Sequence, residues 1–504
     1  MTKERLIFFL LSLFFLACFS FKGSHFLDPD FGWHLTMGKY IISHGIPPTD
    51  PFSYTMPSYP FIDHEWLTNV LIAKGDMFLT YDGVAGVFGL VTIGAILISL
   101  TTLKKRSLSF ALIPFFLTGV TLYSFTGVRP QAMSWLLFAL LLWVVRQERH
   151  FLRFRWGLPF LFLAWVNLHG SFALGIVTLI LAGAYWYWKK KVSMKSVIFL
   201  LGLCLAATGM TPYGFRMWWE VWMQMSDGSL HFAIQEWLPA IFSMDLALWL
   251  FVALSIILVA KNLSKFSLLD RVMYFVLLAS GTSSIRQMPL WLILALPMTG
   301  EAIGYFFDQI KKIPEGERRF RIMGRALTVL VFLFCLPAFW GTISGFGEVN
   351  GASMYPDKAV NYLATHRFNG EVFSPYGWGG YLIWKLPEKK VFIDGRMPSW
   401  RWHAKSDTES SYAFSDYNKF VDNKIAFSKV IRKYDITTFL LPVPGDPKRD
   451  VLTDKIIEFG TKVLHLPLQK DEGYKHIMNE AKKAGWKVVY KDETAIIYQK
   501  NETN

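Results

Sequence analysis

Apolar runs of membrane-spanning length recur through the first two thirds of this sequence, and they constrain the fold more than any other feature. A helix needs about 20 apolar residues to cross roughly 30 Å of hydrocarbon. The chain is 53% hydrophobic, which is more than a typical soluble protein carries. We therefore predict an α-helical polytopic membrane protein with about eleven transmembrane helices. The predicted spans lie near residues 5–21, 83–103, 108–125, 130–147, 157–168, 171–188, 195–210, 244–261, 268–282, 286–306 and 324–345.

Basic residues between the apolar runs predict the orientation of the chain. Cytoplasmic loops of membrane proteins are enriched in Lys and Arg. The rule holds at every turn if the N-terminus is cytoplasmic and if 157–188 crosses twice, although this run could also be one long helix. The prediction is a multi-pass protein of the cytoplasmic (inner) membrane whose C-terminal end is extracytoplasmic. The basic residues behind the net charge of +14 are then explained by their place in cytoplasmic loops, rather than by nucleic-acid binding. The basic clusters lie at 104–106, 146–155, 189–195, 261–271 and 311–325.

The remaining sequence predicts two further regions on the outer side. The long first outer loop, 22–82, carries apolar residues at helical spacing in 31–44 and 62–79, and the Trp-rich stretch 213–224 predicts another interfacial helix. From about residue 350, short strand-like and helix-like pieces alternate, which is typical of a soluble α/β domain with at least part of its sheet parallel. The predicted domains are 1–349, the transmembrane domain with its outer loop, and 350–504, an extracytoplasmic α/β domain. The predicted strands are 371–373, 390–394, 436–441, 487–490 and 495–498, and the predicted helices are 356–365, 426–433 and 474–484.

An acidic motif opens the first outer loop, and other ionisable residues stand at the outer ends of spans. Ionisable groups at membrane depth are costly and tend to be functional. Each also has a simpler explanation: the two arginines could extend to the headgroups, His169 could be a satisfied turn residue, and Glu65 could cap a helix that begins near Asp63. The residues are Asp28, Asp30, His34, His64, Glu65, Arg129, Asn167, His169, Glu236 and Arg286.

Two of these residues, Arg129 and Arg286, point to a phosphate ligand. Each comes just before a proline that begins or bends a helix, and a guanidinium near the positive end of a helix dipole suits a phosphate. The sequence has no GxxxxGK[ST] motif and no strand, GxGxxG and helix unit for a soluble nucleotide donor. The glycine-rich 377–380 is interpreted as a structural turn. A donor used outside the membrane would then be one that the membrane delivers, such as a polyprenyl-phosphate-linked sugar.

These motifs resemble a known superfamily. The order of segments resembles that of the C-type (GT-C) glycosyltransferases. The first span is followed by a long outer loop that opens with an Asp-x-Asp type motif, and then by further spans and an outer C-terminal domain. These include protein O-mannosyltransferases, the aminoarabinose transferase acting on lipid A, and the catalytic subunit of oligosaccharyltransferase. The strings DPDFGWHLTMGKYI, DPFSYT, HEWL, RPQ, NLHG, PYG and DGR look like bacterial membrane proteins described as glycosyltransferase-like. The oligosaccharyltransferase motif WWDYG is absent, which argues against transfer to asparagine.

The resemblance implies a reaction and a set of roles. Asp28 or Asp30 would be the general base of an inverting sugar transfer to an extracytoplasmic glycan, lipid-linked saccharide or protein. Arg129, Arg286 and His169 would stabilise the leaving phosphate, and the need for a divalent cation stays open. The turn 394–396 could contact the acceptor or form a salt bridge. The alternatives are a flippase of lipid-linked saccharide and a non-catalytic envelope-assembly scaffold. The predicted substrate-binding residues are His34, His64, Glu65, Arg129, His169 and Arg286.

Overall fold

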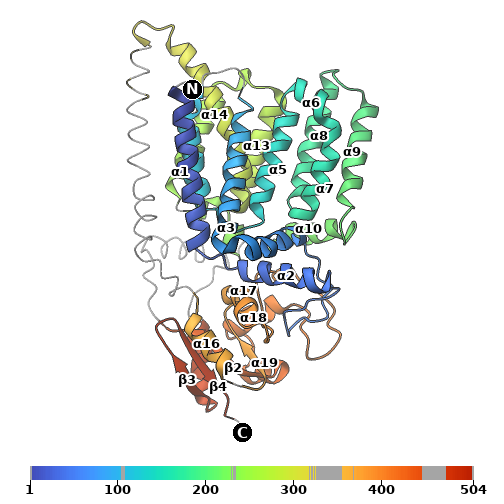
Figure 1. Ribbon diagram of the computed structural model, residues 1–504, viewed down its shortest axis with the longest axis vertical. Helices are drawn as coiled ribbons and strands as arrows, with labels where there is room; N and C mark the ends of the chain where they lie inside the picture. The colour runs from blue at the N-terminus through green and yellow to red at the C-terminus, as the bar shows by residue number, and fades with distance from the viewer. Residues whose placement is uncertain are drawn as a thin grey trace. The chain divides into compact units, whose positions relative to one another are not determined.

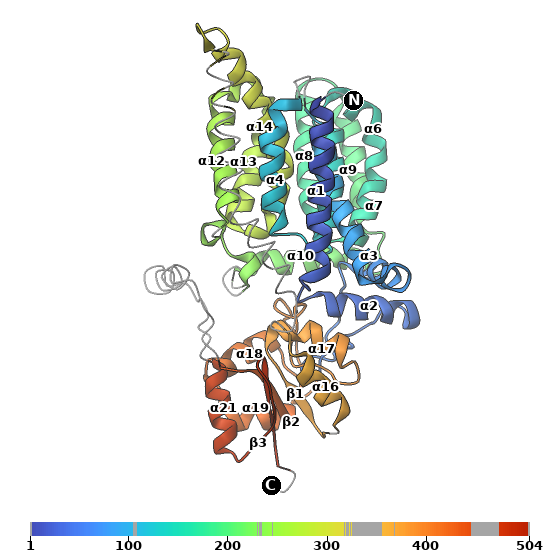
Figure 2. The ribbon, with the colours of Figure 1, turned by 60° about the vertical axis from the view of Figure 1, so that its left-hand side comes forward.

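The computed structural model describes residues 3–501 apart from 104–107, 229, 231–233, 244, 317, 319–321, 323, 325–354, 367 and 445–472. The chain forms two compact units (Figures 1 and 2). The first unit comprises Met1–Phe26, Leu79–Val221 and Glu236–Val349, and the second comprises Leu27–Phe78, Trp222–Gln235 and Asn350–Asn504. The sequence-based division at residue 350 assigned the first outer loop to the transmembrane domain. In the structure, most of that loop packs with residues that follow 350.

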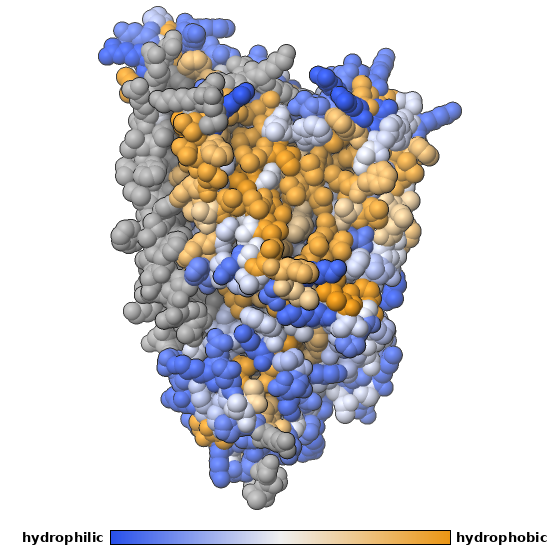
Figure 3. All heavy atoms as spheres, in the orientation of Figure 1, coloured by the Kyte–Doolittle hydropathy of each residue, from blue (hydrophilic) through white to orange (hydrophobic). Residues whose placement is uncertain are grey.

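The first unit is a bundle of apolar helices. Helices coincide with ten of the eleven predicted runs, and the eleventh, 324–345, lies outside the described residues. Apolar side chains such as Phe9, Phe160 and Ile198 are exposed on it, and Figure 3 shows apolar residues spread over these helices. Its helices are α1 (Lys3–His25), the later part of α3 (Trp66–Leu100), α4 (Leu112–Tyr123), α5 (Gln131–Val145), α6 (Glu148–Phe154), α7 (Leu158–Leu168), α8 (Phe172–Trp188), α9 (Met194–Thr208), the start of α10 (Arg216–Ser226), α12 (Leu246–Lys261), α13 (Leu268–Ser283) and α14 (Met288–Ile310).

Helix length alone does not fix the number of spans. Among the described residues, three helices are long and apolar enough to cross a membrane by themselves: Glu4–His25, Trp66–Leu100 and Ile285–Ile310. The other apolar helices are shorter, because short turns and 3-10 segments separate them. The total of about eleven spans stays a prediction.

Two breaks in the helices occur where the sequence suggested them. Thr80 has a φ of 61° inside α3, so α3 is two helices joined by a kink between the predicted interfacial helix 62–79 and the span 83–103. His169 ends α7 in an extended conformation, with φ −167° and ψ 145°, and α8 begins at Phe172. The run 157–188 is therefore two helices rather than one.

A buried ion cluster joins four segments of the first unit. Arg146, at the end of α5, donates from Nε to the Asp270 carboxylate of α13 at 2.8 Å and from Nη1 to the Thr102 hydroxyl at 2.5 Å. The Glu301 carboxylate of α14 lies 4.0 Å from Nη2 of Arg146. The three charged side chains are almost completely buried, and the Arg146 guanidinium offsets part of the charge of the two carboxylates.

The second unit is an α/β fold built around a four-stranded sheet. The strand order is β1-β2-β4-β3; β1 and β2 are parallel and the other neighbours are antiparallel, which confirms a partly parallel sheet. Two helices, α17 and α18, were not predicted. The elements are α2 (Phe31–His44), the start of α3, α16 (Asp357–Thr365), β1 (Glu371–Phe373), α17 (Gly379–Lys385), α18 (Ala413–Val421), α19 (Phe427–Tyr434), β2 (Ile436–Pro442), α21 (Gly473–Lys483), β3 (Lys487–Lys491) and β4 (Ala495–Gln499).

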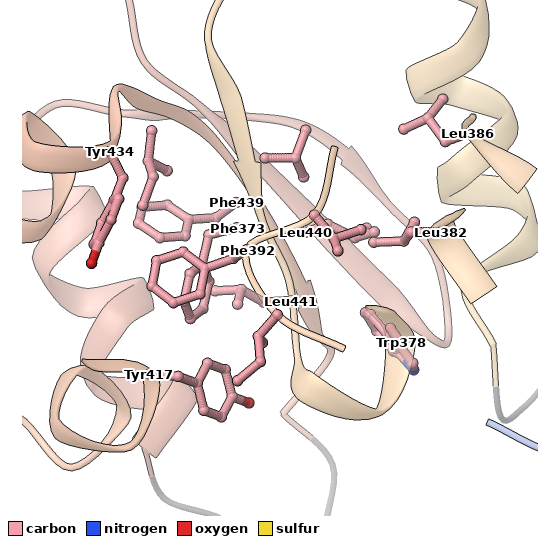
Figure 4. Close-up of a cluster of buried hydrophobic side chains, with 14 of the residues drawn as sticks. Phe373, Trp378, Leu382, Leu386, Phe392, Tyr417, Tyr434, Phe439, Leu440 and Leu441 are labelled. Carbon is pink, nitrogen blue, oxygen red and sulfur yellow. The ribbon is translucent and has the colours of Figure 1, made fainter. Parts of the chain in front are cut away.

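The core of this unit lies on the central strand. Strand β2 is buried along most of its length, as its apolar sequence requires. Phe439 of β2 packs on Phe373, which also contacts Phe392, whereas Leu440 points to the other face of the strand, toward Leu382 (Figure 4). Residues 390–394 do not form a full strand: Val391 makes isolated parallel bridges to Val372 and to Ser53 of the first outer loop. The DPFSYT string thereby continues the edge of the sheet.

Candidate active site

The acidic motif forms the turn that begins α2. Oδ1 of Asp28 accepts the backbone N–H of Asp30 at 2.9 Å, and the Asp28 and Asp30 carbonyl groups accept the N–H groups of Phe31 and His34 at 3.1 Å. An Asp side chain that bonds to the backbone two residues on is a common way to start a turn. Asp28 is 8% exposed and Asp30 is half-buried. The two carboxylates thus differ, because Asp28 holds the backbone that carries Asp30.

Two glycines from the C-terminal part of the second unit contact this turn. A Cβ at Gly395 would lie 1.9 Å from Oδ1 of Asp30, so the carboxylate oxygen fills the space that a side chain would need. A Cβ at Gly380, in the first turn of α17, would lie 2.3 Å from the carbonyl oxygen of Pro29. The motif Asp28-Pro29-Asp30 is therefore in contact with the backbone of both glycines.

The turn that contains Gly395 is fixed by a buried arginine. Arg396 donates to both oxygens of Asp394, at 2.8 and 2.7 Å, and to Oδ1 of Asp50 at 2.7 Å. Burial lowers the pKa of Arg396, but the two carboxylates outweigh it and raise that pKa above its usual value. Of the two interpretations of 394–396, the structure contains the salt bridge.

A buried hydrogen-bond network surrounds His34. The Asn69 amide donates to Oδ2 of Asp63 at 2.8 Å, so its carbonyl oxygen faces Nδ1 of His34 at 2.7 Å. Because a carbonyl only accepts, Nδ1 of His34 carries a proton. Glu65 lies between two imidazoles, 3.7 Å from His34 and 3.5 Å from His64. Asn69 is a site residue that was not predicted, because in the sequence it is only a polar residue inside an amphipathic helix.

Asp63, rather than Glu65, begins the next helix. Its Oδ1 accepts the backbone N–H of Glu65 at 3.0 Å, and its carbonyl accepts that of Trp66. Burial raises the pKa of Asp63 to about 6, although bonds from Glu65 and Asn69 and the charge of Arg396 lower it. Among the described residues, no group of three or more His, Cys, Asp or Glu side chains has the arrangement of a metal site.

In the first unit, the two predicted phosphate-binding arginines meet at one carboxylate. Arg129 donates from Nη1 to Oε1 of Glu236, and Nη1 of Arg286 lies 3.6 Å from Oε2 of the same side chain. Burial raises the pKa of Glu236, but the two guanidiniums outweigh it and the pKa is lowered overall. The arginine side chains keep 26% exposure and Glu236 keeps 37%, so this cluster of two cations and one anion is accessible.

His169 is held in the turn between α7 and α8. The backbone N–H of Ser171 donates to its Nδ1 at 3.2 Å, and the Ser134 hydroxyl, which accepts from the Trp165 indole at 2.7 Å, lies 2.8 Å from the same nitrogen. Nδ1 is therefore an acceptor, and the side chain is buried. Asn167 donates to the carbonyl of Met210 at 3.1 Å. These contacts hold the Nδ1 edge of the His169 ring in the turn, and its role toward a substrate stays a prediction.

The predicted site residues thus form two groups in two units. Among them, Asp28, Asp30, His34, His64 and Glu65 belong to the second unit, whereas Arg129, His169 and Arg286 belong to the first. Within the first group, the chain adds Asn69, Asp63 and Gly395. In the second group, Glu236, which is already among the ionisable residues at the outer ends of spans, contacts both arginines.

Similar proteins are found by comparison of structures and not by comparison of sequences. No protein-family model and no curated protein matches the sequence. The apo oligosaccharyltransferase of Archaeoglobus fulgidus is 11% identical, over 86% of this chain and 69% of its own, with a TM-score of 0.48. The same protein tethered to an acceptor peptide with an NVT sequon is 12% identical over the same shares, with a TM-score of 0.46. ArnT from Cupriavidus metallidurans, bound to undecaprenyl phosphate, is 12% identical over 99% of this chain and 98% of its own, with a TM-score of 0.47.

This chain is similar to the oligosaccharyltransferase and to ArnT over most of its length. All three TM-scores are below 0.5, so these similarities do not assign a function to the chain.

Proposed function

We propose that this protein is a membrane glycosyltransferase that transfers a sugar from a polyprenyl-phosphate donor to an extracytoplasmic glycan, lipid-linked saccharide or protein. The observation that carries the proposal is the arginine pair Arg129 and Arg286. Both lie where apolar helices begin, both are partly exposed, and together they exceed the charge of Glu236 by one. Two guanidiniums at the end of apolar helices suit the phosphate of a lipid whose chain lies in the membrane.

Asp30 is the better candidate for the general base. Asp28 is engaged with the Asp30 backbone N–H, and its side chain is more buried than that of Asp30. In the proposed reaction, Asp30 accepts the proton of the acceptor hydroxyl while that oxygen attacks the anomeric carbon. The bond from the anomeric carbon to the phosphate oxygen breaks, and the polyprenyl phosphate leaves with the electron pair. Arg129 and Arg286 bind that phosphate and stabilise its charge. Because one displacement occurs, the anomeric configuration inverts.

The first test measures donor-phosphate binding. Undecaprenyl phosphate is titrated into the purified protein in nanodiscs, for wild type and for Arg129→Gln and Arg286→Gln. We expect each substitution to weaken binding about tenfold, since each removes a charge-assisted contact. Arg153→Gln, at an exposed arginine beyond α5, is the matched control and should bind like wild type. Equal binding by all four proteins would contradict the phosphate site.

The second test measures catalysis and does not require the acceptor to be known. A deletion strain is complemented with wild type, Asp30→Asn or Asp28→Asn at equal expression, and its envelope glycans are profiled. Asp30→Asn should leave the deletion's glycan defect in place. If Asp30→Asn and Asp28→Asn both restore the glycan, the acidic motif is not catalytic. If the missing saccharide instead accumulates on its lipid at the inner leaflet, the flippase alternative is favoured.

A further inference from the structure

The proposed base is in contact with a residue that has no side chain. The ideal Cβ position of Gly395 lies 1.9 Å from Oδ1, 2.8 Å from Cγ and 3.2 Å from Oδ2 of Asp30. The whole carboxyl group therefore packs on the α-carbon of Gly395. The backbone φ of Gly395 is outside the left-handed region, so an alanine could adopt the same backbone. The three atoms nearest to the Cβ position all belong to the Asp30 carboxyl group, so this group makes the closest contacts that a side chain at 395 would meet.

The turn that carries Gly395 is held from both sides. Asp394 precedes it and Arg396 follows it, and these two form a bidentate pair with distances of 2.8 and 2.7 Å. Arg396 also binds Asp50, and all three charged side chains are at most 2% exposed at their ion-pair contacts. A buried network of this kind fixes its members in one geometry. The backbone of Gly395 is thus held in one position by the ion pairs on either side of it.

A second glycine fixes the backbone of the same motif. The carbonyl oxygen of Pro29, between the two aspartates, lies 2.3 Å from the ideal Cβ position of Gly380. Gly32, in the first turn of α2, in turn faces the carbonyl oxygen of Gly380 at 2.1 Å. Helices α2 and α17 therefore approach closely at the acidic motif. One glycine restricts the Asp30 side chain and the other restricts the peptide before it.

We infer that Gly395 and Gly380 are positioning residues that orient the carboxylate of Asp30 for proton transfer. The inference builds on the proposed function and deepens it, because it assigns Gly395 of the turn 394–396, and Gly380, to the placement of the base. A displacement of about 1 Å can lower a rate about 100-fold even when binding is kept. Gly395→Ala should have that effect, because its methyl group requires the Asp30 carboxylate to move.

The contact itself is tested by a double-mutant cycle on stability. Thermal unfolding is measured for wild type, Gly395→Ala, Asp30→Ala and the double variant. Gly395→Ala should lower Tm by several degrees when Asp30 is present, and by much less in the Asp30→Ala background, where the carboxylate that overlaps the Cβ position is gone. Gly377→Ala is the matched control, since a Cβ at this exposed glycine meets no atom within 4 Å. Equal effects of Gly395→Ala in both backgrounds would overturn the inference.

The positioning role is tested by separating binding from activity. Gly395→Ala should bind undecaprenyl phosphate like wild type but restore envelope glycan in the deletion strain poorly, whereas Gly377→Ala should restore it fully. Loss of both binding and activity would mean a general structural defect and would contradict positioning. Full activity in Gly395→Ala would also contradict it. Failure of the proposed function looks different: Asp30→Asn would then be active, whatever the stability cycle shows.

Discussion

Arg396 donates from Nη1 to the carboxylate of Asp50 at 2.7 Å, although 346 residues of chain separate the two. Asp50 also accepts the backbone N–H groups of Phe52 and Ser53 at 3.2 and 2.8 Å. The strings DPFSYT and DGR, which the sequence offers as family motifs, therefore form one buried structure. Through it, the first outer loop and the residues after 350 fold as one unit.

Breaking this ion cluster should destabilise the second unit strongly. Arg396→Met leaves two buried carboxylates without their counter-charge, which typically costs about 3–5 kcal/mol. Arg396→Lys should rescue little, because a lysine cannot make the bidentate contact to Asp394 and also reach Asp50. Thermal and denaturant unfolding of the purified protein measure the effect.

The matched control is an exposed ion pair in the same unit. Lys424 lies 2.7 Å from Asp422, and their side chains are 67% and 41% exposed. Lys424→Met should change stability by less than about 1 kcal/mol. If Arg396→Met proves as harmless as Lys424→Met, the cluster does not hold the unit together.

Asp63 should make stability depend on pH in an unusual direction. Its pKa is raised from 3.8 to about 6, mainly by burial, so between those values the folded state binds more protons than the unfolded state. Stability from this group is therefore complete below about pH 4 and is lost as the pH rises through 6. The shift corresponds to an order of 3 kcal/mol. Asp63→Asn removes the buried charge, so its stability relative to wild type should rise between pH 4 and 7.

Unfolding is measured across that pH range for wild type, Asp63→Asn and the surface variant Asp422→Asn. The relevant quantity is the difference from wild type, because other carboxylates contribute to both proteins equally. A difference for Asp63→Asn that does not vary with pH, or that falls as the pH rises, would show that Asp63 stays ionised through this range.

Local features were predictable from the sequence, whereas partners distant in the chain were not. The helices near 31–44 and 213–224 follow from the spacing of apolar residues and of Trp, which involves neighbours only. The break at His169 follows from the basic clusters on either side of 157–188, which require two crossings. Arg129 and Arg286 each indicated a phosphate site singly. Their shared contact with Glu236 was not predictable, because it depends on how η3 (Gln235–Trp237) packs. Arg129 and Glu236 are 107 residues apart in the chain.

The same limit explains the residues that the sequence analysis missed at the acidic motif. Gly395 was seen only as part of a turn, because its contact with Asp30 exists only in the folded unit. Asn69 looked like an ordinary polar residue of an amphipathic helix. Its importance comes from Asp63 and His34, which reach it from different segments. The start of α17 lies in the stretch 377–380, which was interpreted as a glycine-rich turn because glycines lower helix propensity. In the folded unit, Gly379 faces the carbonyl oxygen of Ile393 and Gly380 faces that of Pro29.

The predicted orientation can be tested with two exposed lysines. Lys424 lies in the second unit and Lys191 lies between α8 and α9, in a cluster predicted to be cytoplasmic. Each is replaced by cysteine in a background without Cys18, Cys204 and Cys335, and intact spheroplasts are treated with a membrane-impermeant maleimide. Lys424→Cys should be labelled directly and Lys191→Cys only after permeabilisation. The opposite pattern would invert the topology and place the acidic motif on the cytoplasmic side.

Glu236 should limit the affinity of the arginine pair for phosphate. Its carboxylate accepts from Arg129 and lies 3.6 Å from Arg286, where it neutralises one of the two positive charges. The guanidiniums lower its pKa, so it stays ionised well below neutral pH and mild acid does not release it. Glu236→Gln should therefore bind undecaprenyl phosphate about tenfold more tightly, with steeper weakening by salt.

Glu148→Gln, at an exposed ion pair with Lys191, is the control for the loss of a carboxylate elsewhere in the same unit. The direction of the change separates two roles of Glu236. Tighter binding means that the carboxylate competes with the lipid phosphate for the same guanidiniums, so the donor must displace it. Weaker binding means that Glu236 holds the guanidiniums in the geometry that the phosphate needs, and that its charge is not the limiting factor.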